Sequence, residues 1–305
     1  MTSCSESSFT CSDGSCVSLD ERCDGKLDCK DMSDEEDCKI LITFKGYNKM
    51  LVPPPSGNET KFSYNVSVFI NKIMEIDEND GYFKTKFTYV RRWVNSQLIY
   101  EDLKRNPTKN LISSEDKERM WRPWTVFENI KQKTDINPTD APKIMMIIPN
   151  QAFYFEMDDK TNFRNTRLFK GDENIIHYQK EQVVNWVCDF DLRWYPFDLQ
   201  KCTMEMYSST STVMIIPSSV KYLGPKELTR HIVKDVTISS ATINSMPGII
   251  VEVILGRPLF GTTLSVFMPT TVLLVLSQMV RVFGQDHLEM VIEVNLTLLL
   301  VLATL

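Results

Sequence analysis

The side chains with the clearest capacity for chemistry are carboxylates crowded near the start of the chain. Residues 1–39 carry 11 acidic and 4 basic side chains, and seven of these acids follow Cys23. Neighbouring carboxylates repel one another unless a cation lies among them, and Ca2+ binds about six to eight oxygen ligands. The pattern therefore predicts a calcium site in this segment. A solvated acidic face without an ion is the alternative.

Cysteines offer a second kind of chemistry. Six of the eight lie within the first 38 residues, and the other two, Cys188 and Cys202, enclose thirteen residues. An even number in this clustering predicts disulfides and an oxidising, extracytoplasmic compartment. Zinc ligands or free thiols in a cytosolic protein are the alternative, which the absence of any CxxC pair disfavours. Because residues 1–39 contain few apolar side chains, that segment needs such cross-links to fold, and often a metal as well.

Other kinds of chemistry have no matching pattern. The three histidines, His177, His231 and His287, are scattered, and the sequence contains no nucleophile–base pairing, phosphate-binding loop or zinc spacing. We therefore do not expect an enzyme. Apart from the 11 acidic and 4 basic side chains of the first segment, 29 acidic and 30 basic ones remain, so nucleic-acid binding is not expected either. No apolar signal region precedes Cys4, and we expect the sequence to begin at or near a mature or engineered start.

The elements that must position these residues are mainly strands. Residues 64–70 and 83–90 alternate apolar with polar side chains and are rich in β-branched and aromatic types. Many short strands without long helices between them predict a β-sandwich. Residues 40–50 are predicted to form a short helix, which Pro53 to Pro55 would stop. The predicted fold class is mainly β, with a stapled module over 1–39, a sandwich over 40–257 and α-helical transmembrane segments over 258–305.

Two apolar runs at the end of the chain predict those transmembrane helices. Residues 259–280 lack charged side chains and would span ~33 Å as a helix, with Pro269 inside the run. In the second run, from residue 289 to 305, polar side chains share a sector of about 80° on a helical projection. Carboxylates within a membrane are costly unless they face water, so this sector predicts a cation-selective pore lining with a leucine constriction. The sector consists of Glu289, Glu293, Thr297, Leu300 and Thr304.

A competing register turns another face of the same run toward the pore. That face is wholly apolar and leaves Glu293 against neighbouring helices or lipid, so it ranks second. A structural helix without a pore is the remaining alternative. The competing face consists of Ile292, Leu296, Leu299 and Ala303, with Glu289 at the mouth.

The acidic segment closely resembles the LDL-receptor class A repeat. The resemblance rests on the run from Cys23 to Cys38, with its Cys-Asp-Gly start and Ser-Asp-Glu near its end. It implies disulfides Cys4–Cys16, Cys11–Cys29 and Cys23–Cys38. It also implies a calcium site, for a module that either binds a protein partner or serves as an architectural cap. The implied ligands are the side chains of Asp24, Asp28, Asp34 and Glu35 and the backbone carbonyls of Glu21 and Lys26.

The loop from Cys188 to Cys202 resembles the signature disulfide loop of the Cys-loop receptors, the pentameric ligand-gated ion channels. Inside it stand Tyr195-Pro196-Phe197-Asp198 and, after one residue, Gln200. The run Trp121-Arg122-Pro123-Trp124 resembles the family's Trp-x-Pro-Asp motif, with Trp124 in place of the aspartate. The resemblance implies that Arg257 pairs with Asp198 and couples the loop to the gate. The family has four transmembrane helices, so the chain is expected to stop inside the second.

The family's agonist site lies between subunits and is an aromatic box. By resemblance, its positions fall near Thr88, Glu128 and Ser209 and in the hairpin 239–248, none of which is aromatic. Tyr207 could supply one wall, and Glu128 could hold a cation by its charge. We therefore expect an unfamiliar small molecule, a proton or another ion as agonist.

These features predict a subunit of a ligand-gated channel in the plasma membrane, with its N-terminal domain extracellular. The expected partners are four further subunits, as a homopentamer, the lipid bilayer, permeant ions and an agonist. An anion-selective channel, or a non-conducting binding protein on the same sandwich, is the alternative. Asn58 and Asn65 begin sequons suited to glycosylation, whereas Asn295 lies in an apolar run and should stay unmodified.

Overall fold

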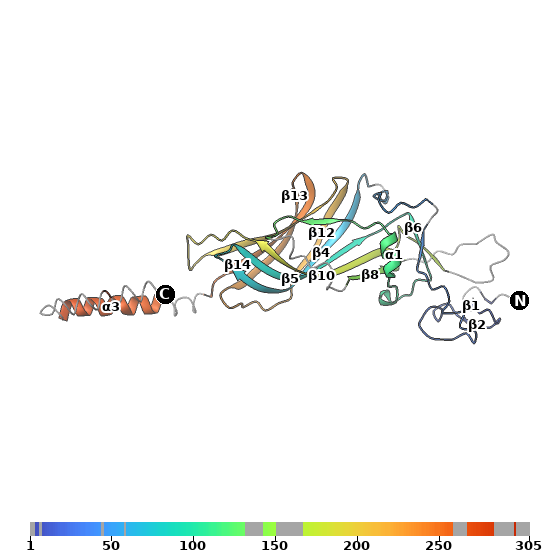
Figure 1. Cartoon of the computed structure of the whole chain (residues 1–305), viewed down its shortest axis with the longest axis horizontal. Helices are drawn as coiled ribbons and strands as arrows, with labels where there is room; N and C mark the ends of the chain where they lie inside the picture. Colours follow the sequence, from blue (N-terminus) through green and yellow to red (C-terminus); the bar gives the residue numbers. More distant parts are fainter. Residues whose placement is uncertain are drawn as a thin grey trace. The chain divides into compact units, whose positions relative to one another are not determined.

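The computed structural model of the chain describes residues 4–5, 8–43, 46–57, 59–131, 143–150, 167–258, 267–283 and 296 (Figure 1). The chain forms two compact units. The first comprises residues 1–188, 203–224 and 236–252, and contains the N-terminal module and most of the sheets. The second comprises residues 189–202, 225–235 and 253–305.

The N-terminal module is held together by disulfides rather than by a large core. A hairpin of β1 (Ser8–Thr10) and β2 (Cys16–Ser18) is its regular structure. The disulfides Cys4–Cys16, Cys11–Cys29 and Cys23–Cys38 are the three that the repeat implies. The buried side chains of Phe9 and Leu19 pack with the Cys11–Cys29 bridge. The module therefore depends on its cross-links, as its composition predicts.

The larger part of the first unit is built on a five-stranded sheet in the order β12-β4-β5-β10-β8. Neighbouring strands run antiparallel except β12, which pairs with β4 in parallel. The predicted strands 64–70 and 83–90 lie within two of its members, which confirms them. The strands are β4 (Phe62–Asp77), β5 (Tyr82–Trp93), β8 (Lys143–Ile148), β10 (Ile175–Val187) and β12 (Val213–Tyr222).

Two smaller sheets accompany it. One has the order β13-β14-β11-β7, with strands β7 (Thr125–Phe127), β11 (Leu199–Ser208), β13 (Ile232–Ile243) and β14 (Met246–Gly256). The other has the order β3-β6-β9, with strands β3 (Leu41–Thr43), β6 (Leu98–Glu101) and β9 (Leu168–Lys170). Short helical segments in this unit are η1 (Pro107–Lys109) and α1 (Ser114–Arg119).

Aromatic side chains fill the space between the five-stranded sheet and β7. The ring centroid of Phe127 lies 6.0 Å from that of Phe87 and 5.6 Å from that of Trp186. On the same side, the Tyr64 and Tyr89 hydroxyls meet the Thr125 hydroxyl at 2.9 and 3.0 Å. Alternate residues of β4, β5, β7 and β10 therefore face a shared core, as in a β-sandwich.

The helix predicted over residues 40–50 is wrong. Residues 41–43 form β3, and Leu41 pairs with Tyr100 of β6. The β-branched Ile40 and Ile42 suit a strand, and a partner strand more than fifty residues away supplies the ladder that local sequence could not reveal.

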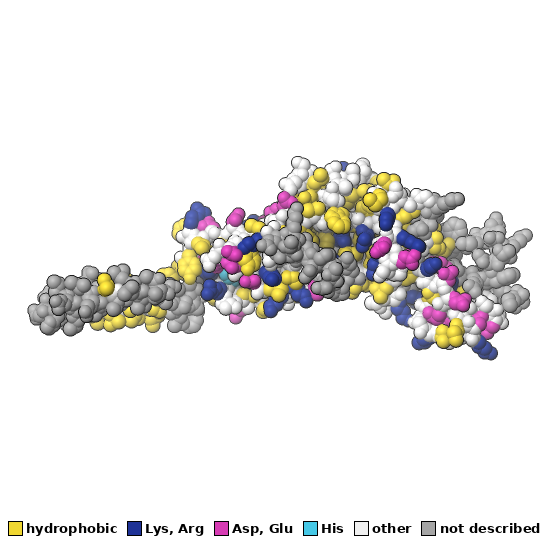
Figure 2. All heavy atoms as spheres, in the orientation of Figure 1, with side chains coloured by type: hydrophobic (Ala, Val, Ile, Leu, Met, Phe, Trp, Pro, Cys, Tyr) yellow, Lys and Arg dark blue, Asp and Glu magenta, His cyan; other side chains and the backbone are white. Residues whose placement is uncertain are grey.

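The second unit contains the loop 189–202 and α3 (Met268–Phe283). Exposed apolar side chains line α3, among them Val272, Leu274 and Met279 (Figure 2). Pro269 stands in the first turn of the described helix, where a missing N–H is tolerated. Within the described ranges, no helix has the length and apolarity that crossing a membrane requires.

Candidate functional site

The loop 189–202 carries a buried ion pair. Arg257 Nε donates to Asp198 Oδ1 at 2.7 Å, and the two side chains are 5% and 2% exposed. Gln200 Nε2 donates to the other oxygen of Asp198, and the Arg257 guanidinium lies 4.6 Å from the ring centroid of Tyr195. Burial by itself would raise the pKa of Asp198, but the hydrogen bonds from Arg257 and Gln200 outweigh it and lower the pKa. The pair is thus charged and buried.

The remainder of this loop divides into an internal brace and exposed side chains. Asp191 N donates to Gln200 Oε1 at 2.9 Å, and Gln200 Nε2 returns a bond to Asp191 O at 2.8 Å. The Tyr195–Pro196 peptide bond is cis, and Phe197 is exposed. Cys188 and Cys202 are both disulfide-bonded. The structure thus brings together Tyr195, Asp198 and Arg257 of the residues predicted to couple loop and gate.

The predicted calcium ligands lie in the turns of the N-terminal module. Asp34 is fully buried; its Oδ2 accepts from Asp28 N at 2.7 Å, while Oδ1 has no hydrogen-bond partner among the described residues. Glu35 Oε1 accepts from Asp24 N and Gly25 N at 2.8 and 3.0 Å. A buried carboxylate oxygen without a donor fits a cation, because an uncompensated buried charge is costly.

The electrostatics of this cluster also favour a bound cation. Burial and the neighbouring carboxylates Glu21, Asp24 and Asp34 raise the pKa of Asp28. Repulsion of that kind is relieved when a divalent ion binds. The four side-chain ligands are nevertheless not drawn together as a closed shell: among the described residues, only Cys11, Cys29 and Asp31 place ligand atoms within 4.8 Å of one another, and those cysteines form a disulfide. Acidic side chains gather over the module in Figure 2.

Three of the four predicted agonist-site residues lie on one face of β7, β11 and the residues directly after each strand. Tyr207 pairs with Val126, Ser209 N donates to Trp124 O at 3.2 Å, and Glu128 N donates to Glu205 O at 2.9 Å. Residues directly opposite each other in an antiparallel pair share a face, and faces alternate along each strand. Since Thr125 and Met206 face the core, this pairing turns Glu128, Tyr207 and Ser209 outward.

The same face contains two residues that the sequence reasoning did not assign to the site. Trp124, 72% exposed, lies opposite Ser209, and Glu205 lies opposite Glu128. The alternation from Trp124 to Glu128 was the signal that could have placed Trp124 there. The face therefore does include a large exposed aromatic side chain, although not at a position of the expected box.

The hairpin between β13 and β14 reaches this face. Asn244 and Ser245 form its two-residue turn, with φ of 51° and 63°, the left-handed values of a type I′ turn. Asn244 Nδ2 donates to Glu128 Oε1 at 2.8 Å. The turn is thus tied to the edge of the candidate site by a charge-assisted hydrogen bond.

Thr88 lies elsewhere. It sits on β5, is 9% exposed and accepts a hydrogen bond from Asn71 Nδ2 at 3.0 Å. Asn71 also donates to Glu181 Oε1 at 2.8 Å, and Lys86 Nζ is 3.1 Å from the same oxygen. Phe87 and Tyr89, on either side of Thr88, face the core, so Thr88 faces away from it. The structure therefore separates Thr88 from the other three residues, on the opposite outer face of the sandwich.

Of the remaining predicted residues, most lie outside the part of the chain that the structure describes. Asn65 is exposed in β4, opposite Arg92. Asn58 lies outside the described residues. So do all five residues of the predicted pore stripe, Glu289, Glu293, Thr297, Leu300 and Thr304.

Comparison with known proteins adds two family matches. The neurotransmitter-gated ion-channel ligand binding domain matches residues 39–222, and the low-density lipoprotein receptor domain class A matches residues 2–38. The first match alone covers more than half of the chain.

Individual relatives are distant. The acetylcholine-gated chloride channel subunit acc-1 of Caenorhabditis elegans is 25% identical over 53% of this chain and 29% of its own length. The glutamate-gated chloride channel subunit beta of Haemonchus contortus is 23% identical over 60% and 38%. The acetylcholine receptor subunit beta-type unc-29 of C. elegans is 21% identical over 89% and 50%. The chain thus spans half or less of these relatives.

The matched ranges coincide with the stapled module and with the part of the sandwich up to β12. The chain therefore belongs to the family of neurotransmitter-gated ion channels, the Cys-loop receptors, and carries an LDL-receptor class A module at its N-terminal end.

Proposed function

We propose that the chain is part of a subunit of a pentameric ligand-gated ion channel in the plasma membrane, with the module and sandwich extracellular. The observation that carries this proposal is the separation of the candidate agonist residues onto opposite outer faces of one sandwich. Two such half-sites can meet only when the face of one copy contacts the other face of the next. A head-to-tail contact of this kind forms a ring when the rotation from one copy to the next closes after a whole number of copies. Five identical copies are the proposed assembly.

The agonist we propose is a small cation or a proton. Glu128 and Glu205 supply negative charge on the β7–β11 face, and the exposed ring of Trp124 can attract a cation through its quadrupole. Thr88, with Asn71 and Glu181, would form the partner half-site on the adjacent copy. Tyr207 and Ser209 line the space between Trp124 and Glu128.

The buried pair of Asp198 and Arg257 is the proposed link between agonist binding and the gate. Arg257 directly precedes the predicted first transmembrane helix, and Asp198 belongs to the disulfide loop with Tyr195, Pro196 and Phe197. Because the pair is buried and hydrogen-bonded, a movement of the loop would carry Arg257 with it. Agonist binding would then shift a closed–open equilibrium.

Calcium is the proposed ion of the N-terminal module. Asp24, Asp28, Asp34 and Glu35 would hold it with the carbonyls of Glu21 and Lys26. The orphaned Oδ1 of the buried Asp34 supports this assignment. The ion would neutralise the acidic cluster and tighten the turns. Glycosylation of Asn65, which is exposed, and of Asn58 is part of the same extracellular proposal.

The proposed cation selectivity rests on the carboxylates Glu289 and Glu293 in the predicted pore stripe. A chloride channel is the second candidate, because the names of two relatives describe chloride channels. Leu300→Ser should wet the predicted constriction and produce current without agonist, which removes the need to know the ligand. Leu299→Ser is the matched control, since it would open the pore only in the competing register.

The measurement is the reversal potential of that current in whole cells. Replacing external sodium by N-methyl-D-glucamine should shift it, while replacing chloride by gluconate should not. A shift that follows chloride instead would make the chain an anion-channel subunit. Absence of current from both variants, with the protein at the cell surface, would contradict the pore assignment.

A further inference from the structure

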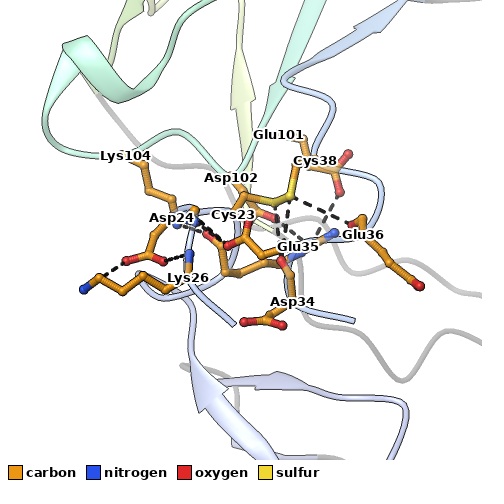
Figure 3. Close-up of a disulfide and its surroundings, with 12 residues drawn as sticks. Cys23, Asp24, Lys26, Asp34, Glu35, Glu36, Cys38, Glu101, Asp102 and Lys104 are labelled. Atoms are coloured by element: carbon orange, nitrogen blue, oxygen red, sulfur yellow. Dashed lines mark hydrogen bonds and ion pairs between the residues drawn. A yellow bond between two sulfur atoms is a disulfide. The ribbon is translucent and has the colours of Figure 1, made fainter. Parts of the chain in front are cut away.

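A lysine from the sandwich side is buried in the N-terminal module. Lys104 follows β6 and is 7% exposed. Its Nζ donates to the carbonyl oxygens of Leu19 at 3.0 Å, of Asp20 at 3.1 Å and of Arg22. All three protons of the ammonium group therefore have acceptors, and all three acceptors belong to one turn of the module. Figure 3 shows the Lys104 side chain reaching toward Cys23 and Asp24 of the module.

A second contact from the same loop reinforces the first. Asp102 Oδ2 accepts from Arg22 Nη1 at 2.6 Å, and both side chains are 6% exposed. Asp102 adopts a φ of 47°, a left-handed conformation that a non-glycine residue rarely takes without compensation. Its Oδ1 accepts from Arg167 N at 3.1 Å, and Arg167 Nη2 donates to Leu19 O at 3.1 Å.

The turn that these residues hold is the one that would supply a calcium ligand. Lys104 binds the carbonyls of residues 19, 20 and 22, and the carbonyl between them, that of Glu21, is a proposed ligand. Backbone carbonyls fixed before an ion arrives lose less conformational freedom on binding it. Within the module, Leu19 packs in the small core and Glu21 N donates to Ser18 O at 2.9 Å, and the contacts of Lys104 add to this support.

We propose that Lys104 is a positioning residue for the calcium site, so that calcium binding and docking of the module on the sandwich stabilise each other. The proposal rests on the calcium site proposed above. On this proposal, calcium holds the module against the sandwich as part of the extracellular domain, and the module does not move independently on a linker.

Simple electrostatics predicts the opposite effect of removing Lys104 on the affinity for calcium. A cation near a calcium site repels the ion, so deleting it should strengthen calcium binding. Lys109 provides the matched control: its Nζ is 4.0 Å from Asp24 Oδ2, its side chain is 50% exposed, and it holds no backbone carbonyl of the turn in any described contact. Lys104→Met and Lys109→Met remove the same charge near the same carboxylates, but only the first releases the turn.

The test is calorimetric titration of calcium into the purified full chain. Lys104→Met should weaken calcium binding about tenfold, equivalent to about 1.4 kcal/mol. Lys109→Met should leave it unchanged or slightly stronger, and Lys104→Arg should restore part of the affinity. Equal or tighter binding by Lys104→Met would overturn the coupling. If the unmodified chain binds no calcium at all, the calcium site itself is wrong, which is a separate outcome.

Hydrogen exchange of the unmodified chain gives an answer even if Lys104→Met fails to fold. Glu101 N donates to Ile40 O and Asp102 N to Arg167 O, both at 2.8 Å. Removing calcium with EGTA should speed exchange at these two amides, on the sandwich side of the contact. Amides of β10, such as Tyr178, should be unaffected. If the exchange rates at residues 101 and 102 are the same with and without calcium, the coupling is refuted, but the assignment of the calcium site is not.

Discussion

Replacing Asp198 by asparagine tests the buried pair in the disulfide loop. The change leaves the Arg257 guanidinium, 5% exposed, without its counter-ion at 2.7 Å. At that distance the Coulomb attraction is about 6 kcal/mol for an effective dielectric constant of about 20, and the desolvation of both groups offsets part of it. Removing one partner of a buried pair costs about 3–5 kcal/mol, because the other charge stays buried.

The loop also contains the control. Asp191 and Arg193 pair at 2.5 Å, but their side chains are 49% and 82% exposed. Asp191→Asn should therefore destabilise the protein much less, because water screens an exposed pair. In thermal unfolding of the full chain in detergent, Asp198→Asn should lower Tm by about 10 °C and Asp191→Asn by about 2 °C or less.

A double-mutant cycle with Arg257→Gln isolates the pair itself. We expect a coupling free energy of about 2 kcal/mol or more between positions 198 and 257. The burial argument fails if Asp198→Asn costs no more than Asp191→Asn, or if the two single effects add to within about 0.5 kcal/mol. The pKa of Asp198 is lowered in the folded state, so its contribution is present above the unfolded value near 3.9 and is lost as pH falls toward the folded one. Asp198→Asn should remove that acid-sensitive part.

Other predictions concern the core, a histidine and the hairpin. Trp186→Ala should destabilise the first unit by about 3–5 kcal/mol in urea unfolding, because the ring is fully buried; Trp186→Phe should cost clearly less, and equal costs would contradict the packing argument. Burial and Arg92 lower the pKa of His177, so the folded state loses stability as pH falls from about 6.5 toward 5; His177→Gln should flatten Tm over that range, and an unchanged slope would show that other groups cause it. Asn244→Gly keeps the left-handed turn but removes the bond to Glu128, so amide exchange at residues 243–246 should speed up several-fold, and unchanged exchange would mean that the bond does not hold the hairpin.

The strands of the sandwich were predictable where a local pattern suffices. The alternation of residues 64–70 and 83–90 places one set of side chains in the core, and both segments lie within strands. The helix expected over residues 40–50 failed because β3 exists only through its pairing with β6. A ladder between distant segments leaves little trace in either of them.

The candidate agonist face also combines features that the sequence predicted with features that only strand pairing revealed. The positions of Glu128, Tyr207 and Ser209 came from the resemblance to the receptor family, and the register of β7 against β11 brings them onto one face. That register also adds Trp124, which in the sequence is only a departure from a motif. Which side chains share a face depends on strand pairing, and pairing is a property of two segments rather than one.

The sequence by itself determined the stapled module, its acidic cluster and the loop between Cys188 and Cys202, because cysteine spacing and clustered charge are local properties of the chain. Only the tertiary structure decided that Lys104, Asp102 and Arg167 hold the module's turn, and that the half-sites around Thr88 and Glu128 lie on opposite outer faces. Those contacts join segments far apart in the chain, and their strength comes from burial, which removes competing water. The residue types alone do not reveal which of these side chains become buried, because burial depends on the folded structure.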